Sequence, residues 1–282
     1  MPTIGPTTGP TTGSTSPARF GYVAAAFFDL DRTLIAGASL FPLGVEAWRA
    51  GLISNGEIRR FATGALAFKL FGDKGERSEG VRTDFLGRVE GVSVEVLHDV
   101  ALRVLPRLVA RVRPESRRLI KMHEQAGRDT WIVSASPYPI VAPLAQRLGM
   151  TGAIATRGKA VDGHYTAELE GPFVYGAGKS EAITQLAGDR GYDLKHSYAY
   201  SDSISDLPML EAVGHPVAVN ADRELTELAH ERGWPVVIFS RKTKQRMAVG
   251  LGSATAAGMA LATYLLGRRH GRIVERSRRE LS

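Results

Sequence analysis

Two aspartates separated by one residue, Asp29 and Asp31, directly follow a short apolar run at residues 22–28. A short apolar run that ends at once in polar residues predicts a buried strand. Ligands of open α/β sheets bind at the carboxyl ends of the strands, where this pair of carboxylates would lie. An aspartate with its usual pKa of about 3.9 is ionised at neutral pH and needs no base to act as a nucleophile. The competing interpretation is a strand-end turn closed by side-chain hydrogen bonds.

A second pair of carboxylates, Asp202 and Asp206, follows another apolar run at 196–200. A spacing of four residues places both on one face of a helical turn. Together with Asp29 they form an oxygen-rich group of the kind that suits Mg²⁺, a hard ion that favours carboxylates and keeps several waters. The alternative is an acidic helix N-terminus that complements the helix dipole. That alternative does not explain why the pair follows a strand.

Ser134 ends a predicted strand at 130–134, and Lys179 begins a predicted helix at 179–188. A serine at a strand end is often only the N-cap of the next helix, and Ser136 competes for that place. A lone lysine at a helix start is usually solvated. The Gly-Ala-Gly-Lys-Ser fragment around Lys179 is not a P-loop, because Phe173 stands where that loop needs its first glycine. Ser134 and Lys179 therefore predict a catalytic or binding role only in combination with the two pairs of aspartates.

These four segments, in this order across about residues 22–220, resemble the four motifs of the haloacid-dehalogenase superfamily of phosphohydrolases, and their spacing is similar to that of its phosphoserine-phosphatase-like branch. The resemblance implies that Asp29 attacks phosphorus to form an aspartyl phosphate. It implies that Asp31 protonates the leaving oxygen and then activates water. The residues it assigns are Asp29, Asp31 and Lys179 for catalysis, Thr33, Ser134, Ala135 and Lys179 for holding the site loop and the phosphoryl group, and Asp29, Asp31, Asp202 and Asp206 for Mg²⁺.

The resemblance therefore predicts a Mg²⁺-dependent hydrolase of a small phosphomonoester. Two departures argue against phosphoserine as the substrate. Ala38 stands where that enzyme has a substrate-binding glutamate, nine residues after the nucleophile, and Ser205 stands where it has an asparagine. A regulatory protein that senses or sequesters a phosphorylated metabolite with little turnover is the alternative function.

Strand-like runs alternate with helical patterns along much of the chain, which predicts an α/β core with a mostly parallel, Rossmann-like sheet. We assign this core to residues 20–36 and 113–240. The stretch 157–170 predicts a hairpin that turns at Asp162-Gly163. The expected strands are 22–28, 130–134, 196–200, 216–219 and 235–239, and the expected helices are 115–126, 138–148, 179–188, 206–213 and 222–232.

About one hundred residues separate the first two strands, which is too many for a simple connection. Apolar residues recur at helical spacing there, and the resemblance implies a helical cap domain at this position. We therefore predict an inserted all-helical cap at 37–112, with a kink at Pro106 in its last helix. The alternative is additional core structure.

The composition of the chain excludes some kinds of site and of binding partner. The chain has no cysteine, which excludes disulfides, thiolate metal sites and cysteine nucleophiles and is consistent with the cytoplasm. The net charge of +7 owes much to residues 241–246 and to six arginines after Gly267, so we predict no nucleic-acid partner.

Both ends of the chain carry separate predictions. Residues 1–19, rich in Pro, Thr and Gly, are expected to be disordered. Within the C-terminal tail, 241–282, the uncharged segment 247–266 is long enough to cross a bilayer. Two interpretations stay open for it: an anchor that holds a cytoplasmic catalytic domain at the inner face of the membrane, or a helix that packs on the core or on another protomer.

Overall fold

The computed structural model describes residues 23–53, 56, 87 and 90–239. Its centre is a six-stranded sheet in the order β3-β2-β1-β6-β7-β8, in which every neighbouring pair is parallel. This sheet confirms the predicted α/β class. The strands are β1 (Ala25–Asp29), β2 (Asp129–Pro137), β3 (Gly152–Thr156), β6 (Tyr198–Ser201), β7 (His215–Val219) and β8 (Val236–Val237).

Strand β3 was not among the predicted strands. Its sequence, Gly-Ala-Ile-Ala-Thr, is short and built mainly of small residues, so it carries little hydrophobic signal. A Cβ at Gly152 would stand 2.5 Å from the Trp131 ring, so a larger residue at this position would displace the ring. The small residue that makes β3 hard to recognise is therefore what lets it pair closely with β2.

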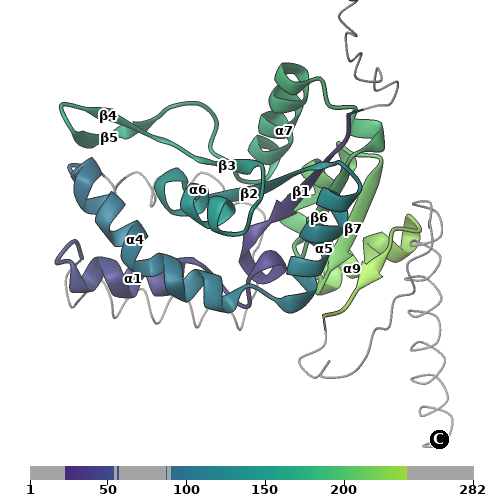
Figure 1. Cartoon of the computed structure of the whole chain (residues 1–282), viewed down its shortest axis with the longest axis horizontal. Coiled ribbons are helices and arrows are strands. Elements are labelled where there is room, and N and C mark those ends of the chain that lie inside the picture. The colour runs from purple at the N-terminus through teal and green to yellow at the C-terminus, as the bar shows by residue number, and fades with distance from the viewer. Residues whose placement is uncertain (1–22, 54–55, 57–86, 88–89, 240–282) are drawn as a thin grey trace, which may run out of the picture.

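Helices cover both faces of the sheet (Figure 1). Alternate residues of β1 point to opposite faces, as the pleat requires: Phe28 packs in one hydrophobic cluster and Phe27 in the other. The first cluster includes residues of α5 (Pro114–Gln125) and α6 (Tyr138–Arg147). The second includes residues of α7 (Ala177–Arg190), α8 (Leu207–Glu211) and α9 (Arg223–Glu231). All five helices were predicted, within a few residues at each end.

The predicted cap, 37–112, contains two described helices, α1 (Leu40–Arg49) and α4 (Val94–Arg111). Helix α4 packs against α6 and α1, and it is a single helix that continues through Pro106. Its apolar face joins the core through Ala101, Val104 and Leu108. Residues 54–55, 57–86 and 88–89 lie outside the described part of the chain, so the extent of the cap stays a prediction.

The predicted hairpin is confirmed as β4 (Gly158–Val161) and β5 (His164–Leu169), at the opposite end of the molecule from α9 (Figure 1). Asp162 and Gly163 both have positive φ, as a two-residue hairpin turn requires. The chain just before α4 pairs with this hairpin: Gly91 N donates to Tyr165 O (2.8 Å), and Tyr165 N donates to Val92 O (2.9 Å). The hairpin is thereby tied to the start of α4.

The predictions for the two ends of the chain lie outside the described residues. They concern residues 1–19, the tail 241–282 and its apolar segment 247–266. Within residues 23–239, as far as the structure describes them, no helix is both long and apolar enough to cross a membrane.

Candidate active site

The predicted nucleophile, Asp29, is the last residue of the central strand β1 and is buried. The chain then makes an irregular turn, η1 (Leu30–Leu34), closed by a hydrogen bond from Ile35 N to Leu30 O (3.0 Å). Arg32 adopts a left-handed conformation in this turn (φ 61°), which is unusual for a residue with a side chain. The turn brings Asp31 back to the same end of the sheet, where its Oδ1 accepts from Ser39 N (2.7 Å).

Lys179 joins the carboxylates of two distant motifs. Its Nζ lies 2.6 Å from Asp29 Oδ1 and 2.7 Å from Asp206 Oδ2, and its side chain is buried. The lysine stands in the first turn of α7, which packs closely on the loop before it. Gly178 permits this packing, because a Cβ there would stand 2.0 Å from the carbonyl oxygen of Phe173 in that loop. The fixed cation predicted from the sequence is therefore in direct contact with the predicted nucleophile.

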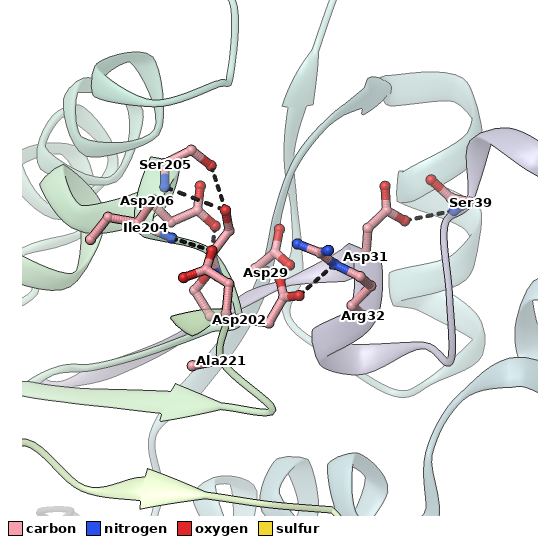
Figure 2. A network of polar contacts seen from close by, with 12 residues as sticks. Asp29, Asp31, Arg32, Ser39, Asp202, Ile204, Ser205, Asp206 and Ala221 are labelled. Carbon is pink, nitrogen blue, oxygen red and sulfur yellow. Dashed lines mark hydrogen bonds and ion pairs between the residues drawn. The ribbon is translucent and has the colours of Figure 1, made fainter. Parts of the chain in front are cut away.

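The second carboxylate pair follows β6. Asp202 comes directly after the strand, and Asp206 ends the short turn η3 (Ile204–Asp206). Ser201 Oγ donates to Asp206 Oδ2 (2.6 Å), while Arg32 Nε lies 2.5 Å from Asp202 Oδ2. Figure 2 shows Asp29 between this loop on one side and Asp31 and Arg32 on the other. The four aspartates thus meet at one end of the sheet, beside the point where the strand order reverses.

Burial and mutual repulsion change how these groups titrate. Burial raises the pKa of Asp29 to about 7; Lys179 opposes this shift, and Asp206 and Asp31 add to it. Burial and the neighbouring Asp29 raise the pKa of Asp202 to about 8, although Arg32 opposes the shift. Burial alone lowers the pKa of Lys179, but the Asp206 and Asp29 carboxylates outweigh it and raise the pKa above its usual value. The lysine therefore stays protonated in a cluster that holds more acidic groups than basic ones.

Asp31 differs from Asp29 in its surroundings. Burial raises the pKa of Asp31 above its usual value, although hydrogen bonds from Ser39 oppose the shift. A raised pKa keeps a proton on the carboxyl group at higher pH, as a general acid needs. Burial raises the pKa of both aspartates, so their contacts distinguish them: Lys179 Nζ lies beside Asp29, and Ser39 N donates to Asp31.

The predicted phosphoryl-binding residues lie at the neighbouring strand. Ser134 is buried near the end of β2, and its Oγ accepts from Ser136 N (3.1 Å). Neither serine caps α6, because β2 continues to Pro137, which precedes the helix without any side-chain cap. Ser136 Oγ instead forms a 2.9 Å hydrogen bond with Ser39 Oγ. Ala135 lies between the two serines and is partly exposed.

The hydrogen bond expected from the Thr33 side chain is not found. Thr33 Oγ1 is buried, with no hydrogen-bond partner among the described residues. Its carbonyl oxygen accepts from Ser116 Oγ (3.2 Å) instead, so Thr33 contributes to holding the turn through its backbone.

Sequence reasoning missed Ser39, Ser201 and Arg32, which bond directly to the predicted carboxylates. Ser201 precedes Asp202 and Arg32 follows Asp31 in the chain, so position alone could have indicated both. Ser39 carried no such signal, because its contact depends on the return of the chain after η1.

A metal ion is implied by the family resemblance, and the donor chemistry fits Mg²⁺. Several buried carboxylates converge here, and oxygen ligands are those that Mg²⁺ prefers. Among the described residues, however, no three His, Asp or Glu side chains are arranged as a metal cluster. In this arrangement Lys179 lies between Asp29 and Asp206, and Arg32 pairs with Asp202. The metal ligands stay a prediction.

Comparison with known proteins supports the motif assignment. Residues 26–211 match the family model for haloacid dehalogenase-like hydrolases. The chain is 41% identical to the probable phosphatase Rv3661 of Mycobacterium tuberculosis over 246 residues, covering 84% of this chain and 83% of the relative. It is 37% identical to the phosphoserine phosphatase SerB1 of the same organism over 239 residues, covering 84% and 77%.

A crystal structure of a Bordetella pertussis protein of unknown function has a similar fold. Its TM-score is 0.68 at 29% identity, covering 77% of this chain and 99% of that one. The family match spans most of the described core and all four motifs. The chain belongs to the haloacid dehalogenase-like hydrolase family, as a phosphatase of its phosphoserine-phosphatase-like branch.

Proposed function

We propose that this phosphatase is a Mg²⁺-dependent phosphomonoester hydrolase that works through an aspartyl phosphate on Asp29. The observation that carries the proposal is the contact of buried Lys179 with Asp29 at the end of the central strand. A carboxylate repels a phosphate dianion, so an aspartate nucleophile needs a cation beside it. Lys179 supplies that cation at a fixed position.

The reaction proceeds in two displacements. A carboxylate oxygen of Asp29 forms a bond to phosphorus while the bond from phosphorus to the alcohol oxygen breaks, and Asp31 gives its proton to that oxygen. Asp31, now ionised, takes a proton from a water molecule that attacks the same phosphorus. This second displacement releases inorganic phosphate and restores Asp29. Lys179 offsets negative charge on the phosphoryl group in both steps.

The side chains of Asp29 and Asp202 and the backbone carbonyl of Asp31 would hold Mg²⁺, and Asp206 would orient the metal's water ligands. When bound, the ion would neutralise charge on the phosphoryl oxygens. Ser134 Oγ and the backbone N–H of Ala135 would bind those oxygens; in support, both residues lie near the end of β2, which pairs with β1 beside Asp29.

The substrate is proposed to be a small phosphomonoester whose recognition does not depend on an amine. Ala38 is exposed just before α1, and its carbonyl accepts from Arg111 Nη1 (3.4 Å). It provides no anionic partner for an ammonium group. We therefore expect no preference for phosphoserine over analogues that lack the amine.

Hydrolysis by the purified full chain tests the proposal. The substrates are p-nitrophenyl phosphate, phosphoserine, phosphoethanolamine and phosphoglycolate, each with Mg²⁺ or EDTA. We expect metal-dependent release of phosphate that Asp29→Asn abolishes, while Asp189→Asn, an exposed aspartate of α7, has no effect. Similar rates for phosphoserine and phosphoglycolate would support the assignment of Ala38. Folded, Mg²⁺-bound protein without turnover would contradict catalysis and favour the regulatory alternative.

A further inference from the structure

Asp222 connects the loop that carries Asp202 and Asp206 to helix α9. It follows β7 and is the N-cap of α9, where its Oδ1 accepts from Leu225 N (2.8 Å). Its Oδ2 accepts from Ile204 N (3.0 Å), and its own N donates to Asp202 O (2.8 Å). Figure 2 shows Ile204 and Ala221, the residue before Asp222, on either side of Asp202. Of these three hydrogen bonds of Asp222, two reach the loop that carries Asp202 and Asp206.

The second carboxylate oxygen does more than a helix cap requires. One acceptor is enough to cap a helix N-terminus, and Oδ1 supplies it. The bond to Ile204 N crosses 18 residues of sequence. By contrast the side chain of Asp193, the N-cap of the short turn η2 (Leu194–His196), bonds only to Lys195 N and His196 Nδ1. The Asp222 side chain thus has a long-range contact that the side chain of this other aspartate cap lacks.

The position of that contact matters for the site. Ile204 N is the first N–H of η3 and has no partner within so short a turn. The Asp222 carboxylate accepts from Ile204 N, and Asp222 N donates to the Asp202 carbonyl. Asp222 therefore holds the backbone between the metal-ligand candidates Asp202 and Asp206. The carboxylates of Asp202, Asp206 and Asp29 repel one another when ionised, which contributes to the raised pKa of Asp202. A turn without this anchor would let the carboxylates move apart.

We propose that Asp222 is a positioning residue that sets the geometry of Asp202 and Asp206 for Mg²⁺ and for Lys179. This inference rests on the proposed function, because it takes the same carboxylates as the metal ligands. Asp222 does not touch the reacting atoms in this role. It acts through the backbone of Asp202 and Ile204.

The substitution Asp222→Asn separates positioning from helix capping. Asparagine caps helices as well as aspartate does, so α9 keeps its cap. It has one side-chain oxygen, however, and its NH₂ group cannot accept from Ile204 N. We expect the Mg²⁺ dissociation constant of the full chain, measured by calorimetry, to rise at least about tenfold, the loss typical when an outer-shell partner of a metal ligand is removed. Loss of the hydrogen bond itself should lower the free energy of unfolding by about 1–3 kcal/mol, so the variant should stay folded.

Asp193→Asn is the matched control, because it alters an aspartate cap that does not contact the site. It should leave the Mg²⁺ affinity unchanged. A wild-type Mg²⁺ affinity in Asp222→Asn would overturn the inference, and so would a wild-type protein that binds no Mg²⁺. Because the affinity is measured without substrate, the two proposals can fail separately. A wild type that binds Mg²⁺ without turnover would contradict the proposed hydrolysis, while the affinity of Asp222→Asn still decides the role of Asp222.

Discussion

Two glycines of helix α7, Gly178 and Gly188, provide a paired test of how the site lysine is placed. Both stand inside the helix, so helix propensity alone predicts that alanine at either position raises the free energy of unfolding by up to about 1 kcal/mol. Their surroundings differ. A Cβ at Gly188 meets nothing within 4 Å, whereas one at Gly178 would stand 2.0 Å from the Phe173 carbonyl oxygen and 3.1 Å from its carbon.

The expected loss of stability in Gly178→Ala follows from the 2.0 Å distance between the added Cβ and the Phe173 carbonyl oxygen. Real Cβ atoms essentially never approach closer than 3.0 Å, so the start of α7 or the Phe173 peptide has to move by about 1 Å. Overpacking of this kind typically costs about 1–3 kcal/mol. The propensity term is the same at both positions and cancels, so Gly178→Ala should be less stable than Gly188→Ala by about 1–3 kcal/mol. Urea denaturation of the two variants measures this difference.

The same displacement should also move Lys179 and lower the rate of catalysis. Lys179 follows Gly178 directly and contacts Asp29 and Asp206 at 2.6 and 2.7 Å. A misplacement of about 1 Å can cost about 100-fold in rate. We expect kcat for p-nitrophenyl phosphate to fall by that order in Gly178→Ala and to be unchanged in Gly188→Ala. Equal stability and equal kcat in the two variants would refute the claim that close packing at Gly178 places the lysine.

Three further predictions concern other parts of the structure. Burial and the nearby Arg128 lower the pKa of His123 to about 3, so below its usual value of 6.5 the unfolded chain takes up a proton that the folded chain does not. When the pH falls from 8 to 5 in EDTA, the free energy of unfolding of the wild type should therefore drop by about 2 kcal/mol more than that of His123→Gln, as urea denaturation measures it. Free energies of unfolding that fall equally with pH in the two proteins would contradict this. Lys179→Arg keeps the positive charge but not the compact ammonium group that contacts Asp29 and Asp206 in a buried position, so kcat should fall at least about 100-fold in folded protein. A near-normal kcat would mean that the charge alone suffices. Tyr165→Ala removes the hairpin ring that packs against Leu97, so amide hydrogen exchange should accelerate at the start of α4 but not in β1, and unchanged exchange at α4 would show that the hairpin does not hold it.

The sequence by itself determined the class of fold and the chemistry of the site. Apolar runs and helical periodicity report burial within one element, and for this reason they located β1, β2, β6 and the helices around them. Asp29, Asp31, Asp202 and Asp206 were recognisable because each pair stands at or just after the end of an apolar run, and parallel strands place their carboxyl ends at one edge of the sheet. A strand of small residues such as β3 carries too little of this local signal to be found.

Only the tertiary structure decided which side chains bond to each other. Lys179 contacts Asp29 across 150 residues of sequence, and Asp222 holds Ile204 across 18. The serines weighed as helix caps bond elsewhere, because β2 extends to Pro137, and Pro137 is itself the N-cap of α6. Such contacts depend on backbone positions set by the packing of several elements at once. A pattern within one element contains no information about them, because side-chain pairs at hydrogen-bond distance require the whole arrangement of the sheet and its loops.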